Sequence, residues 1–339
     1  MRAALVTPLS GPLEGFGRAG AEALRLWAGS AADLPGARGR VELSVHDSGP
    51  GVAPALRAAL DGGPDLLFGP YGTRDALAMA RGTGRLVWNH GGASGRLSRH
   101  DHVVSVLSPA SSYFEGALEM LRGEVRTVTV LHAETVFGRE VAVGAQRKAE
   151  ALGLAVRRTG FAPGTAAAAA RRAPPADVMM VAAGFEDERA AGRVLAERPW
   201  RACALVGAGE EDVLAGLGEA RDGWLGPAQW LADRPWEPDE GPDGDWFVRR
   251  YGELTGTVPP YPAAQAFAAG LIAARCAREA GGFDDRALRA AAAALACTTM
   301  FGPFRLDRSG AQVGHPVLTV RWQGGRRRVV WPPELVRDR

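Results

Sequence analysis

Short apolar segments alternate with longer amphipathic segments along the first 100 residues, and this alternation constrains the fold more than any other feature. Apolar runs at 3–6, 65–70 and 85–90 and an alternating run at 41–47 are typical of strands, while 18–31 has apolar residues at helical spacing. Strand and helix units joined by short loops favour a parallel sheet covered by helices. In such sheets, ligands bind at the carboxyl ends of the strands.

A second set of strand and helix patterns begins near residue 125. Strands are expected at 127–133, 154–161, 177–184 and 202–209, with helices between them. The segment 301–332 is instead typical of antiparallel strands, with a Gln-Gly-Gly turn. At 339 residues the chain is long for a single core, so two α/β domains are expected.

Composition excludes several classes of protein. The chain has 40 Lys and Arg residues against 38 Asp and Glu, and its net charge of +2 is too small to indicate binding to nucleic acid or to an anionic membrane. No apolar run reaches the ~20 residues needed to span a bilayer. Cys203, Cys276 and Cys297 lack metal-ligand spacing, and their odd number argues against a disulfide framework. We expect them to be buried apolar residues.

The first residues, MRAALVTPLSGP, reach a turn signal before the apolar segment of a secretory leader is complete. Two interpretations follow. Either the protein stays in the cytoplasm, or a leader was removed or lies upstream.

The segment LVWNHGGASGR (86–96) raises the possibility of an enzyme, because a strand followed by His-Gly-Gly is similar to an oxyanion-hole segment of lipase-type hydrolases. A nucleophile elbow needs Gly-x-Ser-x-Gly, and the sequence around Ser94 ends in Arg96 where the last glycine should stand. An enzyme therefore remains only as a minor alternative in which the segment HGGAS (90–94) works with a nucleophile from elsewhere in the chain, and loss of ester turnover in Ser94→Ala would support it. No catalytic residue is predicted.

Cofactor and metal motifs are also absent from the sequence. The single lysine, Lys148, lies within a helical segment and not in a phosphate-binding loop, and GAGEED (207–212) has Asp212 where a dinucleotide-binding loop needs its third glycine. The pair His100 and His102 lies in a polar loop without a clear third ligand, which favours a solvated turn over a zinc site. We expect no cofactor and no metal.

Six short motifs follow one another along nearly the whole chain. They are PLSGPLEGFG (8–17), FGPYGT (68–73), WNHGGAS (88–94), HAETVFGRE (132–140), YPAAQAFAAG (261–270) and FGPFRLDRSGAQVGH (301–315). In this order they resemble the type I periplasmic-binding-protein family, specifically its branched-chain amino-acid (Leu/Ile/Val)-binding branch. Members of that branch serve as substrate-binding proteins of ABC transporters.

The resemblance implies two doubly wound parallel-sheet lobes joined by three hinge crossovers, near 108–110, 226–229 and 301–304. Lobe 1 would hold residues 1–108 plus 231–302, and lobe 2 would hold residues 109–230 plus 303–339. The ligand would lie in a cleft between the lobes, and hinge closure would bring binding groups from both lobes onto it.

The resemblance also implies a set of ligand-binding residues. Thr73 would hold a carboxylate of the ligand, and Gly91 and Gly92 would let the ligand approach the main chain. The other implied contacts lie on the same loops or on matching motifs: Phe16, Tyr71, Gly72, Trp88, His90, Ala93, Phe137, Phe185 and Tyr261. An acidic residue of lobe 2 would hold an ammonium group, either Glu210 or Glu211, with Glu186 in reserve.

Two departures from the family pattern bear on the ligand. Ala93 stands where the family has a hydroxyl residue, and phenylalanines stand at 16, 137 and 185 where it often has tyrosines. Phenylalanine keeps the apolar face and loses the polar tip, which favours an apolar or aromatic ligand side chain. Structural alternatives stay open: Thr73 as a helix N-cap, His90 as a tie for its loop, and the aromatic residues as core packing.

The function implied is a solute-binding protein that captures an amino acid or a related small organic solute by cleft closure for an ABC importer. Its partners would be the small-molecule ligand and an ABC permease. The alternative is a cytoplasmic ligand sensor of the same fold, similar to the amide sensors, that acts on a regulatory protein.

Overall fold

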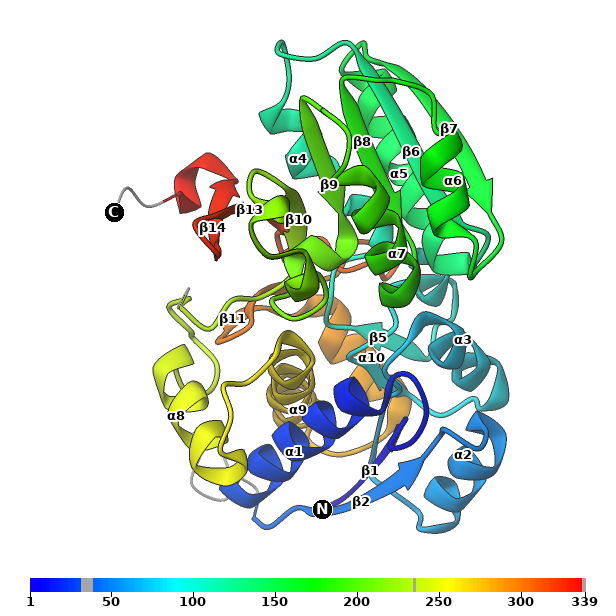
Figure 1. The fold of residues 1–339 in the computed structure, drawn as a ribbon. Helices are drawn as coiled ribbons and strands as arrows, with labels where there is room; N and C mark the ends of the chain where they lie inside the picture. Colours follow the sequence, from blue (N-terminus) through cyan, green and yellow to red (C-terminus); the bar gives the residue numbers. More distant parts are fainter. Residues whose placement is uncertain (32–38, 234–235, 337–339) are drawn as a thin grey trace. The chain divides into compact units, whose positions relative to one another are not determined.

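The computed structural model describes residues 1–31, 39–233 and 236–336 (Figure 1). The chain forms two compact units, each assembled from two separate stretches of sequence. Unit 1 comprises Met1–Ser108 and Trp230–Pro316, and unit 2 comprises Pro109–Gln229 and the chain from Val317 onward. Each unit has a sheet of parallel strands covered by helices. The predicted α/β class, with parallel sheets in two lobes, is confirmed.

Unit 1 is built on a five-stranded parallel sheet with the order β2-β1-β3-β4-β5. Its strands are β1 (Arg2–Thr7), β2 (Glu42–Asp47), β3 (Leu66–Phe68), β4 (Val87–Asn89) and β5 (Val103–Ser105). Leu5, Phe68 and Trp88 are aligned across β1, β3 and β4 and are fully buried. Because all the strands run in one direction, the loops after β1, β3 and β4 leave the same edge of the sheet.

Helices pack against this sheet and against one another. They are α1 (Glu14–Ser30), α2 (Val52–Asp61), α3 (Thr73–Gly82), α8 (Gly244–Thr255), α9 (Tyr261–Ala280) and α10 (Asp285–Ala294). The helices α1 and α9 lie side by side, and Trp27 of α1 meets Phe68 edge-on with ring centroids 5.6 Å apart (Figure 1). A Cβ at Gly270 of α9 would lie 2.5 Å from the Trp27 ring, so this close contact requires glycine.

Unit 2 contains a seven-stranded sheet with the order β14-β13-β10-β9-β8-β6-β7. Its strands are β6 (Thr127–Ala133), β7 (Ala155–Phe161), β8 (Val178–Ala182), β9 (Ala202–Leu205), β10 (Leu225–Ala228), β13 (Leu318–Gln323) and β14 (Arg326–Trp331). The strands β6 to β10 pair in parallel, and β13 and β14 add antiparallel pairs at one side. The antiparallel character expected near the end of the chain is therefore observed.

The helices of unit 2 are α4 (Glu115–Met120), α5 (Val136–Ala151), α6 (Ala166–Arg172) and α7 (Phe185–Leu195). Short 3-10 helices occupy Gly95–Arg99 in unit 1 and Ala110–Ser112, Val206–Gly209, Ala215–Arg221 and Pro333–Leu335 in unit 2. The helices α6 and α7 pack against each other over a core of buried alanines, valines and leucines. Within the described ranges, none of the helices has the length and apolar character that a membrane span requires.

The last crossover lies later in the chain than the sequence predicted. The chain passes into unit 2 after Pro316 and not near 301–304, so residues 303–316 belong to unit 1. A two-stranded ribbon of β11 (Ala296–Thr299) and β12 (Gly302–Arg305) holds this segment, and the Gln312 side chain donates to the Val106 carbonyl at 3.2 Å.

The second crossover differs by one residue. Trp230 was expected in lobe 2, but it belongs to unit 1, where its indole N–H donates to the Met300 carbonyl at 3.0 Å.

All three cysteines are buried and free, as expected from their spacing. Burial raises the pKa of Cys203, Cys276 and Cys297 to about 12 in each case, which leaves almost no thiolate at neutral pH.

We expect no reaction of the native protein with a thiol reagent such as Ellman's reagent, and reaction of three thiols after unfolding in guanidinium. Rapid release of one equivalent of chromophore from the native protein would contradict this burial.

Glu188 of α7 is a buried carboxylate that the sequence analysis did not identify. Its Oε1 accepts hydrogen bonds from the amides of Ala183 and Val206 at 3.1 and 3.2 Å, and its Oε2 accepts from the amide of Gly207. Burial raises the pKa of Glu188 to about 8, although these amides favour the charged form. One side chain thus links the end of β8, the end of β9 and helix α7.

Replacing Glu188 by glutamine should destabilise the protein. The glutamine NH₂ cannot accept a hydrogen bond, so at least one buried backbone N–H loses its partner, at a cost of about 1–3 kcal/mol. The free energy of unfolding in urea measures this loss. Glu186→Gln, an exposed change on the same helix, is the matched control and should leave the stability within about 0.5 kcal/mol of the starting protein. Equal stabilities for the two variants would contradict the structural role of Glu188.

Candidate ligand-binding site

Three aromatic rings come together where the strands of unit 1 end. Phe16 of α1 stacks on Tyr71, with ring centroids 5.0 Å apart and an interplanar angle of 11°. Tyr261, the first residue of α9, has its ring centroid 6.3 Å from both of the other rings. The hydroxyl groups of Tyr71 and Tyr261 are hydrogen-bonded to each other. These three predicted ligand residues therefore form one group, which we call the unit 1 aromatic cluster.

The loop after β3 connects this cluster to helix α3. Tyr71 forms an isolated parallel bridge with Gly91, and the Gly72 amide donates to the Gly91 carbonyl at 3.1 Å. Gly72 has φ of 101°, a conformation that favours glycine, and it immediately precedes the first residue of α3. The loops after β3 and β4 are thus joined through their main chains.

Thr73 is the first residue of α3 and is half-buried. The alternative that it serves as the N-cap is wrong, because Gly72 occupies that position and no side chain caps the helix. The first turn of α3 therefore presents backbone N–H groups together with the Thr73 hydroxyl. Asp75 is the acidic residue of this turn, and its carboxylate accepts a hydrogen bond from Arg74 at 3.0 Å.

Gly91 and Gly92 are needed for packing inside unit 1. A Cβ at Gly91 would lie 2.5 Å from the Tyr71 Cα, and one at Gly92 would lie 2.3 Å from the Ala76 Cβ. The side chain of Asn89 accepts from the Gly92 amide at 2.8 Å and from the Gly91 amide at 3.4 Å. These amide groups already have an acceptor, and packing inside unit 1 by itself accounts for the two glycines.

Trp88 and His90 lie in the core of unit 1, with exposed fractions of 0%. A Cβ on Gly20 would lie 3.1 Å from the His90 ring, which therefore packs under α1. Burial lowers the pKa of His90 to about 4, so its imidazole is neutral at pH 7. Neither side chain exposes surface in the structure, and a contact of either one with a ligand stays a prediction. Both side chains belong to the part of the core that supports the loop after β4.

Ala93 and Ser94 complete the loop after β4. Ala93 is buried, and its methyl side chain has no hydroxyl group. The Ser94 hydroxyl accepts a hydrogen bond from the Arg96 amide at 3.2 Å and caps the 3-10 helix Gly95–Arg99. A capping hydroxyl accounts for this serine without a catalytic role.

Unit 2 has a second group of polar and aromatic side chains. The hydroxyl of Tyr113 accepts a hydrogen bond from Gln229 Nε2 at 2.9 Å, and its ring meets Phe137 edge-on with centroids 5.9 Å apart. Burial raises the pKa of Tyr113 to about 12, and the charge of Glu210 contributes to the rise. Phe137 was predicted, whereas Tyr113 and Gln229 were missed. We call Tyr113, Phe137, Gln229 and Glu210 the unit 2 polar cluster.

The structure distinguishes the three acidic candidates. Glu210 is half-buried and ends the 3-10 helix Val206–Gly209. Glu211 is exposed and pairs with Arg327 at 3.2 Å, and Glu186 is exposed at the start of α7. Burial raises the pKa of Glu210 to about 8, with Asp212 and Glu211 adding to the rise and Arg327 opposing it. Of the three candidates, Glu210 is thus the one least exposed to solvent.

Phe185 is the first residue of α7 and packs, half-buried, against the core of unit 2. The alternative of core packing therefore accounts for much of its surface.

The comparisons with known proteins agree with this architecture. A model of the periplasmic binding protein family matches residues 1–326. A leucine-binding protein from Thermotoga maritima is 18% identical, with a TM-score of 0.81, over 97% of each chain. A solute-binding protein of an ABC transporter from R. palustris, in complex with benzoate, is 19% identical, with a TM-score of 0.79, over 97% of this chain and 95% of its own. Another from R. palustris, in complex with 4-hydroxybenzoate, is 14% identical, with a TM-score of 0.83, over the same shares.

The chain belongs to the periplasmic binding protein family, since the family model covers nearly its whole length. The fold is that of type I members of this family. These are binding proteins and not enzymes, so the chain is a ligand-binding protein.

The raised pKa of Glu210 gives a prediction about pH. In the unfolded chain this carboxyl ionises near its ordinary value of 4.5, whereas in the native protein it ionises near 8. Between these values the native state binds more protons than the unfolded state, so the contribution of Glu210 to stability falls as pH rises through this window. Glu210→Gln removes this contribution.

The stability of Glu210→Gln relative to the starting protein should therefore increase from pH 5 to pH 9, as measured by urea unfolding at several pH values. Glu211→Gln is the matched control, because its carboxylate is exposed and already ion-paired. A difference between Glu210→Gln and the starting protein that does not change with pH would contradict the raised pKa.

Proposed function

We propose that this protein is a solute-binding protein that captures a small organic acid, either an amino acid or an aromatic carboxylic acid, for an ABC importer. The observation that carries the proposal is the position of the unit 1 aromatic cluster directly before the first turn of α3. Tyr71 belongs to the cluster, and Thr73, two residues later, begins the helix. A group of aromatic rings and a set of hydrogen-bond donors are therefore adjacent.

The first turn of α3 suits a carboxylate. Its backbone N–H groups lie at the positive end of the helix dipole, and the Thr73 hydroxyl adds one donor. Arg74 pairs with Asp75 and reduces the repulsion that this acidic residue would exert on an anion. The faces of Phe16, Tyr71 and Tyr261 would then contact the apolar part of the same ligand.

We further propose that the unit 2 polar cluster takes part in binding the same ligand. Support comes from the chemistry of the cluster, which combines one apolar ring, an amide, a hydroxyl and a carboxyl. A ligand that touches both units favours the closed arrangement of the protein, and this differential affinity is what shifts the population toward closure. Glu210 would hold an ammonium group if the ligand is an amino acid.

The relatives favour transport over the cytoplasmic sensor. Two of the three named above are solute-binding proteins of ABC transporters, and both of these have a benzoate bound. The third binds leucine, so the two ligand classes considered for this chain are both represented.

A thermal-shift screen tests the proposal with leucine, phenylalanine, benzoate and 4-hydroxybenzoate as probes. A ligand present at about 100 times its Kd adds about 2.7 kcal/mol to the free energy of unfolding. For unfolding of units of this size the melting temperature should rise by about 5–10 °C. If none of a broad panel of amino acids and organic acids shifts the melting temperature, the proposed ligand class is wrong.

Thr73→Ala should weaken binding of the ligand that the screen identifies by about tenfold or more, because the carboxylate loses one charge-assisted hydrogen bond. Thr73→Ser keeps the hydroxyl and should restore most of the affinity, as isothermal titration calorimetry would measure. Thr159→Ala changes an exposed threonine of β7 and serves as the control. Equal affinities for Thr73→Ala and Thr159→Ala would remove Thr73 from the site.

Glu210→Gln separates the two ligand classes. An amino acid should lose affinity because its ammonium group loses a carboxyl partner that can ionise beside it, whereas an aromatic carboxylate should keep its affinity.

A further inference from the structure

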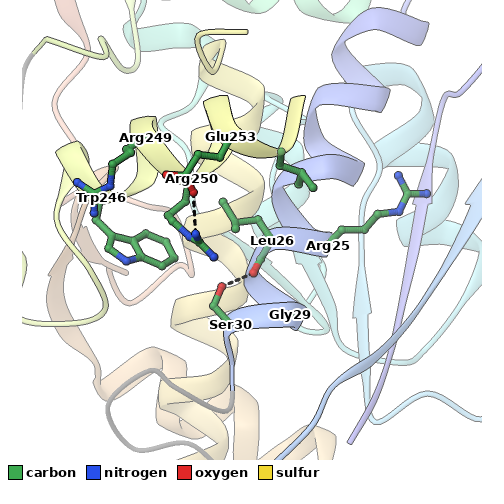
Figure 2. Close-up of a pocket in the computed structure, with 9 residues that line it drawn as sticks. Arg25, Leu26, Gly29, Ser30, Trp246, Arg249, Arg250 and Glu253 are labelled. Carbon is green, nitrogen blue, oxygen red and sulfur yellow. Dashed lines mark hydrogen bonds and ion pairs between the residues drawn. The ribbon is translucent and has the colours of Figure 1, made fainter. Parts of the chain in front are cut away.

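A groove lies between α1 and α8 of unit 1, away from the residues proposed to bind the solute. Its volume is about 630 Å³. It is lined by the last turns of α1 and by one face of α8: Arg25, Leu26, Gly29, Ser30, Trp246, Arg249, Arg250, Glu253 and Leu254. In Figure 2, Arg250 lies between the two helices and the Arg25 guanidinium points outward.

The floor of the groove is apolar. Trp246 packs on Phe267 of the unit 1 core, with ring centroids 5.9 Å apart, and Leu26 is half-buried. Leu254 is 51% exposed and adds apolar surface to the groove. Gly29 leaves the wall open, because a Cβ at this position would meet no atom within 4 Å.

The rim of the groove is basic. The residues that line it include Arg249 and Arg250 of α8 and Arg25 of α1, but only one carboxylate, Glu253. The ion pair of Arg250 with Glu253, at 2.6 Å, joins side chains that are 51% and 52% exposed, so it contributes little to stability. Arg25 pairs in a similar way with Glu22, at 2.6 Å. Within the described part of the chain, Arg249 has neither a hydrogen-bond nor an ion-pair partner.

We propose that this groove is a docking site for an acidic segment of a partner protein. A large apolar side chain of the segment would lie on Leu26, Trp246 and Leu254, and flanking carboxylates would pair with Arg249 and Arg250. Charge complementarity selects the occupant, because the guanidinium groups outnumber the carboxylate of the groove and can form bidentate pairs. An amphipathic helix or an extended segment in a groove between two helices is a common recognition mode.

The groove is formed by residues of unit 1 alone. Docking there needs no residue of the aromatic cluster and none of the polar cluster. The partner would therefore be held with or without a bound solute, and the inference stands or falls independently of the proposed function.

Fluorescence anisotropy with labelled peptides and the full chain tests the proposal. The probe is acetyl-Glu-Asp-Leu-Leu-Asp-Glu-amide, with two control peptides in which the acidic residues become lysines or the leucines become serines. The acidic peptide should bind at least about tenfold more tightly than either control, and its affinity should fall as salt rises from about 0.05 M to about 0.5 M. Equal binding of the three peptides overturns the proposal.

Protein variants locate the binding site. The double variant Arg249→Glu/Arg250→Glu should lower the affinity by about tenfold or more, while Arg57→Glu/Arg286→Glu, which changes exposed arginines of α2 and α10, should not. Gly29→Trp should fill the groove without changing charge, and Gly29→Ala controls for the gain in helix propensity. Unchanged affinity in Gly29→Trp overturns the proposal.

A second copy of this chain is the competing occupant. A dimer in sedimentation equilibrium that Arg249→Glu/Arg250→Glu dissociates would also overturn the proposal.

Discussion

Backbone pairing among β1, β3 and β4 holds three loops at one edge of the unit 1 sheet. Leu5, Phe68 and Trp88 are aligned in register, so the residues after each strand emerge at the same level. The main-chain contacts between Tyr71, Gly72 and Gly91 extend this pairing into the loops. Phe16 and Tyr261 then reach Tyr71 from two helices that pack side by side. Without this common register, the aromatic rings and the first turn of α3 would not be neighbours.

Much of this arrangement was predictable from local patterns. Alternating strand and helix periodicity predicts parallel sheets, and parallel sheets place their loops together whatever the side chains are. Thr73 could be placed at a helix start because a glycine precedes it and an amphipathic segment follows. The grouping of Phe16, Tyr71 and Tyr261 needed more than periodicity, since Tyr261 lies 190 residues from Tyr71, and it came from the order of the motifs.

Sequence reasoning failed where a role depends on which face of an element a side chain occupies. His90 directly follows β4, and its sequence position left both a ligand contact and a structural role open; only the fold shows that its ring packs under α1. Glu188 resembles any first-turn acid of a helix, and only three converging amides give it a distinct role. Tyr113 and Gln229 are 116 residues apart, and no local pattern links them. The last crossover was misplaced because Gln312 acts through long-range hydrogen bonds.

Helix α1 carries Phe16 near its beginning and Leu26 and Gly29 near its end. Its 17 residues extend over about 25 Å. Between these ends Gly17 lies against the Pro8 carbonyl at a distance that admits no larger residue, and Gly20 packs closely against the His90 ring. The two ends of α1 therefore belong to separate surfaces, and residues at one surface can be substituted without changing the other. Under the two proposals made above, substitutions at the Phe16 end of α1 would change the ligand while the residues that line the groove stay the same.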